Sequence, residues 1–438
     1  MIFSHVLIRK EFRRASHSES PSRRETSDKI PILLKPIIEA NKMQVKNPSQ
    51  ITKGSALKFV ILLGVVSLLA DMTYEGARSV TGPYLEVLGA SATAVGFFAG
   101  LGELIGYGLR IFTGLLADKT HKYWTITITG YCINLFAVPM LALAGNWQVA
   151  VLLMMLERTG KAIRTPARDA MLSHGTQQTG RGWGFGLHEA MDQIGAMTGP
   201  LIVSLVLFVN GGYKSAFVVL LIPALLAIAF LLLARALYPR PQDLEVEVVN
   251  VQGKGFPKVF WILLSAAALL GAGYADFPLI AFHFQKVSLA SESVIPIFYA
   301  VAMGVDAIAA LAFGKMFDRF GVPVLILATA LSMFFAPLVF WGGFGVAMIG
   351  AAVWGIGMGA QESIMRASIP HMVSANRRGS AYGLFNTGYG LFWFAGSSLM
   401  GVLYDISIPA LVAFSMAAQF AAIPLLLIAA RKENKEKA

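Results

Sequence analysis

The sequence GLLADK at residues 114–119 returns 200 residues later as GKMFDR at residues 314–319. In both copies an aspartate follows the glycine by four positions and precedes a basic residue, and each copy ends a long apolar stretch. Further along, RGWGFG at residues 181–186 corresponds to RGSAYG at residues 378–383. Because internal repeats indicate a duplicated architecture, the chain is predicted to consist of two similar halves.

The composition indicates a membrane protein. Of the 438 residues, 56% are apolar and 14% are charged, and the mean hydropathy is +0.63. A soluble chain carries about 25% charged residues, so a soluble enzyme, a nucleic-acid-binding domain and a disordered scaffold are excluded. The net charge of +11 does not indicate nucleic acid, since the basic residues collect between apolar runs. The single cysteine, Cys132, allows no internal disulfide and no cysteine metal site.

Twelve apolar runs are long enough to cross a bilayer, which takes about 20 residues of helix. In lipid, the backbone amides must be satisfied within each segment, so the runs are expected to be helices. The sequence predicts an all-α membrane protein of twelve transmembrane helices in two pseudo-symmetric six-helix bundles. The predicted spans are 57–84, 93–117, 124–144, 147–171, 184–209, 215–237, 258–284, 293–316, 322–341, 346–372, 380–404 and 407–430.

The positive charges predict the orientation of the chain. Most loop lysines and arginines lie in the amino-terminal stretch, the even-numbered loops and the carboxyl tail, whereas the odd-numbered loops hold only Lys214 and Lys286. This bias places both termini in the cytoplasm of a multi-pass protein of the cytoplasmic membrane. The predicted parts are a disordered basic extension (1–55), an amino-terminal bundle (56–237), a cytoplasmic linker (238–257), a carboxyl-terminal bundle (258–430) and a tail (431–438). The basic extension is expected to contact anionic lipid; the alternative is that translation starts at Met43.

The two GxxxD-K/R loops resemble the signature loop between helices 2 and 3 of the major facilitator superfamily, and the arrangement of six plus six spans covers residues 57–430. The resemblance implies the fold of that superfamily, alternating access to a cavity between the halves, and a monomer. It also implies a gate, in which the loop aspartate pairs with helix ends and a nearby arginine. In the first copy, Thr120 and His121 stand where a glycine is usual. The gating candidates are Arg110, Gly114, Asp118, Lys119, Gly314, Asp318 and Arg319.

The fifth span contains GAMTGP at residues 195–200, which resembles the antiporter motif of the same superfamily. The usual glycine pair that follows is replaced by Val203 and Ser204. By this resemblance the motif favours export.

Ionisable residues inside a span are costly, so each one requires a reason. In the first span Asp71, Glu75 and Arg78 follow the spacing i, i+4, i+7 and share one helix face, as do Glu157, Lys161, Arg164 and Arg168 in the fourth span. The structural alternative is that such charges neutralise one another, and Arg168 is expected to snorkel or to pair with Asp169. The resemblance places helices 1 and 4 at the substrate path. The substrate-cavity candidates are Arg78, Glu103, Glu157, Arg158, Lys161, Arg164, Asp276, Tyr382 and Asn386.

Carboxyl groups removed from water can exchange a proton near neutral pH. The proton-coupling candidates are therefore Asp71, Glu75, Glu189 and Asp192. The stretch His188-Glu189-x-x-Asp192 has an aspartate where a zinc protease helix has its second histidine, so no metal site is predicted.

The second half holds fewer charges. Asp276 and His283 lie seven residues apart in the seventh span, and Asp306 lies in the eighth. Glu362 and Arg366 form an i, i+4 pair that is expected to be structural, while Tyr382, Asn386 and Tyr389 share a face suited either to binding or to packing. We expect the amino-terminal half to handle ions and the carboxyl-terminal half to contact the substrate.

The sequence therefore predicts a secondary active transporter of a small solute, coupled to protons and working in export. Uptake of an organic anion, favoured by the basic stripe of the fourth span, and transport of a metal or siderophore are the alternatives. No phosphate-binding loop is present, so ATP-driven transport is not predicted. Neither an enzyme nor a cofactor is expected, and the partners are the solute, protons and the lipid bilayer.

Overall fold

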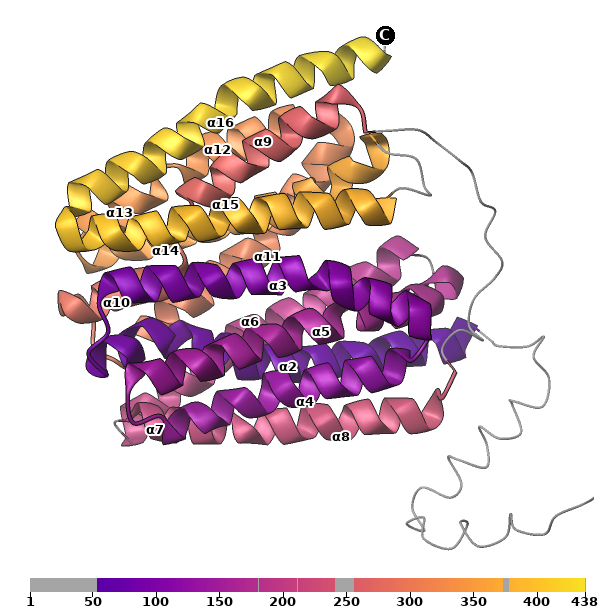
Figure 1. Ribbon diagram of the computed structural model, residues 1–438, viewed down its shortest axis with the longest axis horizontal. Helices are drawn as coiled ribbons and strands as arrows, with labels where there is room; N and C mark the ends of the chain where they lie inside the picture. Colours follow the sequence, from indigo (N-terminus) through magenta and orange to yellow (C-terminus); the bar gives the residue numbers. More distant parts are fainter. Residues whose placement is uncertain (1–52, 180, 211, 241–255, 373–377, 438) are drawn as a thin grey trace, which may run out of the picture. The chain divides into compact units, whose positions relative to one another are not determined.

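The computed structural model describes residues 53–437 except 180, 211, 241–255 and 373–377. The predicted extension, up to residue 52, and most of the predicted linker lie outside the described residues. The described part is helical, and its helices form two bundles that lie side by side, with most helix axes running in a similar direction (Figure 1).

The amino-terminal bundle contains the first six predicted spans. Two of them are interrupted: the third ends in a short 3-10 helix, and the sixth is formed by two helices in sequence. The helices are α2 (Lys53–Val87), α3 (Ala92–Thr120), α4 (Tyr123–Met140) with η1 (Leu141–Leu143), α5 (Trp147–Thr179), α6 (Arg181–Asn210), and α7 (Tyr213–Val219) with α8 (Leu221–Leu237).

The carboxyl-terminal bundle contains the other six spans, and the seventh and ninth are each formed by two helices. The helices are α9 (Lys258–Gly273) with α10 (Phe277–Lys286), α11 (Ile295–Phe320), α12 (Pro323–Ser332) with α13 (Phe335–Trp341), α14 (Phe344–Met372), α15 (Arg378–Ile406) and α16 (Ile408–Lys437). Within the part of the chain that it describes, the structure thus confirms twelve transmembrane helices in two bundles. The predicted tail 431–438 is helical up to Lys437, because α16 continues past the apolar span.

Ten of the twelve spans are long and apolar enough within the described residues to be identified by hydropathy alone. The two others are α5 and α15. Helix α5 holds several charged residues in its middle, and α15 is rich in glycine, serine and other polar residues. Both are held by neighbours, since α5 packs against α4 and α3, and α15 packs against α3 and α9.

The seventh span differs from the prediction of one continuous helix. Helix α9 ends at Gly273, and Asp276 has the extended backbone (φ −64°, ψ 141°) of a residue that precedes α10. Asp276 and His283 therefore do not share a helix face. The backbone freed by the break is satisfied by side chains, as lipid requires: the Ser415 hydroxyl donates to the Gly273 carbonyl at 2.6 Å, and the Trp354 indole donates to the Ala275 carbonyl at 2.9 Å.

Each signature loop begins with a residue of positive φ, but the two turns differ: His121 has ψ 18°, whereas Gly321 has ψ −150°. Helix α3 is followed by His121 at φ 53°, and α11 is followed by Gly321 at φ 68°. Both values lie in the left-handed region, which favours glycine. His121 therefore ends α3 with a positive φ although it is not a glycine, and the first loop turns differently from the second.

The bundles contact each other through α3 with α15, α6 with α11, and α2 with α10. We name the end of the bundles at the α3–α4 and α11–α12 loops the linker end, and the other the opposite end. Glycines allow the closest approach near the opposite end. A Cβ atom on Gly96 would lie 2.6 Å from the Ser397 carbonyl oxygen and 2.8 Å from the Gly401 Cα. Gly82 faces the carbonyl of Pro278 in the same way.

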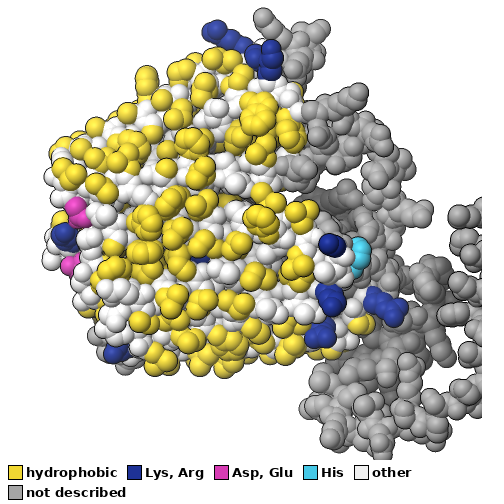
Figure 2. Space-filling view, viewed as in Figure 1, with side chains coloured by type: hydrophobic (Ala, Val, Ile, Leu, Met, Phe, Trp, Pro, Cys, Tyr) yellow, Lys and Arg dark blue, Asp and Glu magenta, His cyan; other side chains and the backbone are white. Residues whose placement is uncertain are grey.

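The outer surface matches a lipid environment. Figure 2 shows a broad apolar face between two ends that carry charged side chains, with lysines and arginines gathered toward the linker end. Large apolar side chains such as Phe112, Leu115, Phe208 and Leu311 are more than half exposed on this surface. Exposure of so much apolar surface is expected of a protein whose belt contacts hydrocarbon.

Candidate functional site

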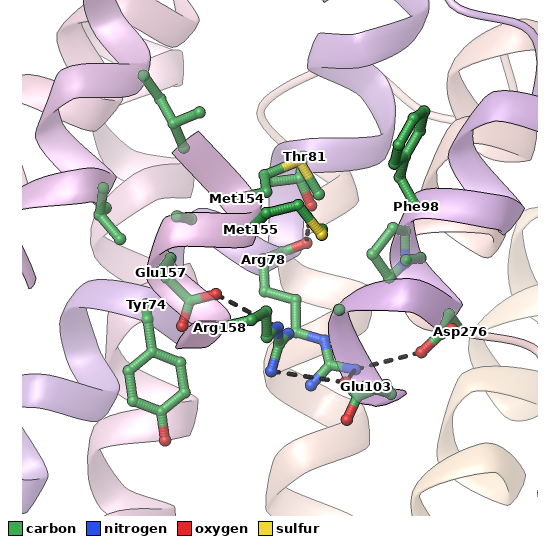
Figure 3. A pocket seen from close by; sticks show the side chains of 16 residues that line it. Tyr74, Arg78, Thr81, Phe98, Glu103, Met154, Met155, Glu157, Arg158 and Asp276 are labelled. Atoms are coloured by element: carbon green, nitrogen blue, oxygen red, sulfur yellow. Dashed lines mark hydrogen bonds and ion pairs between the residues drawn. The ribbon is translucent and has the colours of Figure 1, made fainter. Parts of the chain in front are cut away.

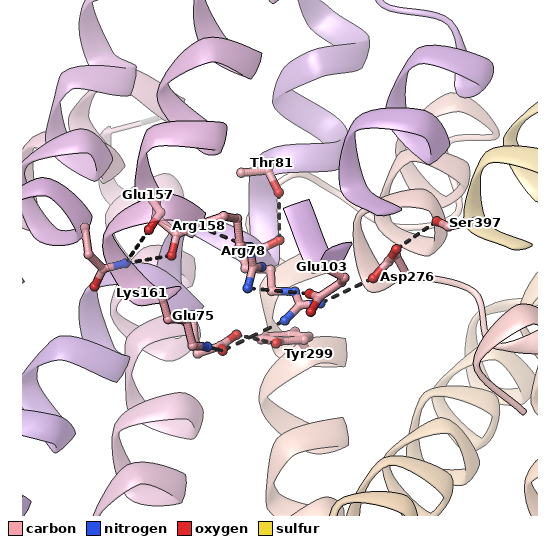
Figure 4. A network of polar contacts seen from close by, with 11 residues as sticks. Glu75, Arg78, Thr81, Glu103, Glu157, Arg158, Lys161, Asp276, Tyr299 and Ser397 are labelled. Carbon is pink, nitrogen blue, oxygen red and sulfur yellow. Dashed lines mark hydrogen bonds and ion pairs between the residues drawn. The ribbon is translucent and has the colours of Figure 1, made fainter. Parts of the chain in front are cut away.

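A network of charged side chains lies where the two bundles meet (Figure 4). The acids and bases come from α2, α3, α5 and the break between α9 and α10, and neighbouring hydroxyls come from α11 and α15. We call this set the central network. Its members are Glu75, Arg78, Glu103, Glu157, Arg158, Lys161, Asp276, Tyr299 and Ser397.

Arg78 on α2 is the centre of this network. Its Nη2 atom lies 2.8 Å from Glu103 Oε1 on α3 and 3.4 Å from Asp276 Oδ1 in the other bundle. Its Nη1 atom lies 4.0 Å from Glu75 Oε1. The second oxygen of Asp276 accepts a hydrogen bond from Ser397 at 2.8 Å. A guanidinium has several fixed donors, so Arg78 can bind acids of both bundles at once.

Glu75 is the second bridge between the bundles. Tyr299 on α11 donates a hydrogen bond to Glu75 Oε2 at 2.5 Å, while Lys161 Nζ on α5 lies 3.6 Å from Glu75 Oε1. Glu75 and Tyr299 are 7% and 1% exposed, so this contact is shielded from water. Lys161 also lies 4.0 Å from the centre of the Tyr74 ring.

The α5 side of the network is held within the amino-terminal bundle. Arg158 lies 3.5 Å from Glu103 Oε1 and 3.3 Å from Glu157 Oε2. Asn134 on α4 donates to Glu157 Oε1 at 2.8 Å. The acids of this bundle thus keep partners of their own, whatever the other bundle does.

A pocket opens onto the central network (Figure 3). The charged groups Arg78, Glu103, Glu157, Arg158 and Asp276 share its wall with apolar side chains of α3, α4 and α5. The free space is about 30 Å³, enough for roughly two water molecules. An organic solute would need the surrounding helices to move apart. The apolar lining includes Phe98, Val138, Leu141, Met154 and Met155.

A second group of buried charges lies inside the amino-terminal bundle, between α2, α5 and α6. We call it the amino-bundle cluster and define it as Asp71, Arg164, Arg168, His188 and Asp192. Arg168 Nη2 lies 2.8 Å from Asp169 Oδ1, which confirms the pairing expected for Arg168, and Arg168 also donates to Ser67 at 3.0 Å. His188 Nδ1 lies 3.4 Å from Asp192 Oδ2. The Arg164 guanidinium lies 4.3 Å from the centre of the Tyr131 ring.

The structure divides the predicted proton-coupling residues between these two groups. Glu75 lies in the central network, and Asp71 and Asp192 lie in the amino-bundle cluster. Glu189 follows His188 on α6 and is half-buried. The four carboxyl groups, although grouped together by the sequence, have different partners.

The predicted substrate-cavity residues are also divided. Six of the nine belong to the central network or to the pocket wall, or to both, and Arg164 belongs to the amino-bundle cluster. Tyr382 and Asn386 lie half-buried on α15, outside the pocket lining. The side chains of Glu362 and Arg366 lie outside the described residues.

The predicted gate is described only in part, because the side chains of Asp118 and Asp318 lie outside the described residues. A Cβ atom on Gly114 would lie 3.6 Å from the Pro166 Cβ of α5, an ordinary van der Waals distance. Lys119 and Arg319 are exposed at the linker end. The Arg110 guanidinium lies 5.0 Å from the centre of the Tyr107 ring. The gate stays a prediction.

Sequence reasoning missed three side chains of the site: Tyr299, Ser397 and Asn134. Each is neutral and lies within an apolar span, so nothing in charge or spacing distinguished it. The available signal was that a buried hydroxyl or amide needs a hydrogen-bond partner. This signal does not identify which residue the partner is. Among the described residues, no group of three or more His, Cys, Asp or Glu side chains is placed to hold a metal ion.

The fold and the site together define a multi-pass membrane transporter built from two six-helix bundles around a charged interface. The profile of the Major Facilitator Superfamily matches residues 63–397 and 277–438. The chain therefore belongs to the major facilitator superfamily.

The relatives agree with this family. An uncharacterized protein of Mycobacterium tuberculosis (strain H37Rv) is 41% identical over 379 residues, covering 85% of this chain and 93% of that protein. An uncharacterized MFS-type transporter of Methanocaldococcus jannaschii is 24% identical over 80% of this chain and 89% of its own length. A shorter match, 33% identical over 28% of this chain and 30% of the relative, is to the multidrug resistance protein MdtH of Proteus mirabilis.

Among solved structures, the crystal structure of the nucleoside transporter NupG is similar with a TM-score of 0.66 and 16% sequence identity. The similarity covers 85% of this chain and 98% of NupG. At this identity the likeness supports the fold and says nothing of the substrate.

Proposed function

We propose that this chain is a proton-coupled secondary transporter that exports a small organic solute by alternating access, with the central network as the coupling site. The observation that carries the proposal is the ion pair between Arg78 and Asp276, which joins the two bundles at the pocket.

The partners of these two residues differ in a way that supports coupling. If the bundles part at this point, Arg78 keeps Glu75 and Glu103 in its own bundle. Asp276 has no other cation within 4.0 Å among the described residues. A buried carboxylate without a counter-charge is costly, so separation requires that Asp276 bind a proton or a positively charged group of the solute. Movement of the bundles is thereby linked to binding of a positive charge.

The orientation is part of the same proposal. Lys119, Lys122 and Arg319 lie exposed at the linker end, and Arg431 and Lys432 at the end of α16 belong to the same side of the chain by topology. By the positive-inside rule we place the linker end and both termini in the cytoplasm and the protein in the inner membrane. Close packing near the opposite end then corresponds to closure on the outer side.

Export is supported by two features. The GAMTGP stretch of α6 resembles the antiporter motif. In addition, a relative that matches 28% of this chain is named a multidrug resistance protein. The pocket wall combines methionines and a phenylalanine with acids and arginines, which suits an organic solute with both apolar and polar groups.

The proposal is tested in liposomes that contain the purified protein and a pH-sensitive dye. Ethidium serves as an organic-cation probe and fluorescein as an organic-anion probe, under an imposed pH gradient of either direction. We expect one of the two probes to move in the direction opposite to the protons. The proton flux should rise when that probe is present. Probe movement that does not depend on the pH gradient would contradict proton coupling. Probe movement in the same direction as the protons would contradict export by antiport.

The matched variants are Asp276→Asn and Asp306→Asn. Both aspartates are buried in the carboxyl-terminal bundle, and Asp276 is the one that belongs to the central network, through its ion pair with Arg78. Asp276→Asn is expected to uncouple probe movement from proton flux, whereas Asp306→Asn keeps the coupling ratio. Equal coupling in the two variants would exclude Asp276 as the coupling group.

A further inference from the structure

One buried acid of the amino-terminal bundle differs from the others in having no counter-ion. Asp71 on α2 is 6% exposed, and its Oδ1 atom has no hydrogen-bond partner. No ion pair within 4.0 Å joins Asp71 to any described residue. By contrast Glu75, Glu103 and Glu157 each have a lysine or an arginine within that distance.

The surroundings of Asp71 do not supply the missing partner at short range. The charged groups that act on it are Asp192 on α6, Lys161 and Arg164 on α5, and Glu75 on its own helix. Lys161 is directed to Glu75 and the Tyr74 ring, and Arg164 to the Tyr131 ring. A second acid, Asp192, therefore acts on Asp71 while both nearby cations lie against other groups.

Helix packing fixes Asp71 in this position. Gly195 of α6 is so close to α2 that a Cβ atom there would lie 3.0 Å from the Asp71 Cβ. His188 and Asp192 lie seven and three residues before Gly195, so they share the face of α6 that meets α2. His188 Nε2 and Asp192 Oδ1 are also buried without a hydrogen-bond partner. Three buried polar atoms without a hydrogen-bond partner thus belong to the faces of α2 and α6 that meet here.

The ligand that fits this region is a proton. A metal cation would need several oxygen ligands and would lie beside the cations Arg164 and Arg168, which repel it. A proton needs one carboxyl oxygen, removes the uncompensated charge, and lets the second oxygen act as acceptor.

We propose that Asp71, together with Asp192 and His188, forms a proton-binding site inside the amino-terminal bundle, separate from the central network, and that Asp71 carries the proton in this conformation. On α2, Asp71 lies four residues from Glu75, about 6 Å along the helix and nearer the linker end. The site therefore stands between the linker end and the central network. The use of this site in transport rests on the proposed function. The protonation of Asp71 is independent of the proposed function.

Infrared spectroscopy tests the protonation directly and needs no substrate. The full-length protein in lipid nanodiscs is titrated from acid to alkaline pH in H₂O and in D₂O. We expect the C=O stretching band of a protonated carboxylic acid at neutral pH, shifted by deuteration, in the wild type. The band is expected to disappear in Asp71→Asn. Absence of the band in the wild type, or the same band in Asp71→Asn, would overturn the proposal.

Two further variants keep the test decisive. Glu103→Gln removes an acid paired with two arginines and is expected to leave the band unchanged. Asp71→Glu keeps a carboxyl group and should move the band to a new frequency. This variant provides the test if Asp71→Asn does not fold. An unmoved band in Asp71→Glu excludes Asp71. The titration is repeated with sodium in place of potassium, and loss of the band in sodium alone would assign the site to Na⁺ instead.

The liposome assay separates this inference from the proposed function. If the wild type couples probe movement to protons but Asp71→Asn shows the wild-type infrared band, only the second site is excluded. If the wild type shows no coupling while the band is lost in Asp71→Asn, the proton site stands and proton-coupled export fails.

Discussion

At the scale of single residues, the stability of the site depends on which acidic side chain is paired with which basic side chain. Replacing a buried ion pair by apolar residues often costs no stability, whereas removing one partner leaves a costly unpaired charge. Arg78 has acids on both sides of the bundle interface, so its loss would leave Asp276 with no cation within 4.0 Å among the described residues. Stability at this point should therefore depend on the balance of charge more than on the number of contacts.

The first prediction is a rescue by a second substitution. Arg78→Gln is expected to lower the free energy of unfolding by about 3–5 kcal/mol, because it leaves a buried charge unpaired. Adding Asp276→Asn to Arg78→Gln should recover part of this loss, since it removes the unpaired carboxylate. Thermal unfolding of the purified variants measures both changes.

The control for this cycle is Arg319→Gln, which removes an exposed arginine at the linker end. It should change the free energy of unfolding by no more than about 0.5 kcal/mol. A double variant less stable than Arg78→Gln would show that Asp276 is stabilised by something other than Arg78.

At the scale of elements, two local features position the site. The break between α9 and α10 places Asp276 on extended backbone at the interface, with the freed carbonyls bound by Ser415 and Trp354. Close approach of α3 to α15 depends on Gly96, which has no side chain to separate the two backbones. A larger residue there must push the helices apart near the opposite end.

The second prediction compares two glycines of α3. Gly96→Val is expected to widen the opposite end, whereas Gly106→Val should not, because no atom lies within 4 Å of a Cβ on Gly106. Spin labels at Val87 and Ile406, both exposed at that end, report the distance by electron–electron resonance in a Cys132→Ala background. The same distance in Gly96→Val and in the wild type would disprove the role assigned to Gly96.

At the scale of the whole molecule, transport requires that the two bundles separate at each end in turn. At the opposite end Asp405 of α15 accepts hydrogen bonds from the backbone N–H and the hydroxyl of Thr93, at 2.8 and 2.7 Å. Ser204 of α6 donates to the Ser293 carbonyl at 2.6 Å. These contacts join different bundles, so they must break when the opposite end opens.

The third prediction is that a covalent bond at this end stops transport. In the Cys132→Ala background, oxidation of Thr93→Cys with Asp405→Cys should reduce probe flux to the level of empty liposomes, and reduction should restore it. Each single-cysteine variant, treated in the same way, is expected to keep its flux. Undiminished flux in the cross-linked protein would mean that this end does not open during transport.

Much of the fold was predictable because its signals are local. Apolar length sets the number of spans, as the twelve helices confirm, and the repeated GxxxD loops indicate the duplication. The helix break at Asp276 was not predictable, because its carbonyls are satisfied by residues far along the chain, Ser415 and Trp354. Spacing placed Asp71 and Glu75 on one face of α2, but it gave no reason to separate them.

By itself the sequence determined that this protein crosses the membrane in twelve helices, in two related halves, with charges inside the first half, since hydropathy, repetition and residue type are properties of short segments. Only the tertiary structure decided that Glu75 is bound by Lys161 and Tyr299 while Asp71, one turn away, has no counter-ion within 4.0 Å among the described residues. Ion pairing depends on distances of a few ångströms between different helices, and those distances arise only when the bundles pack.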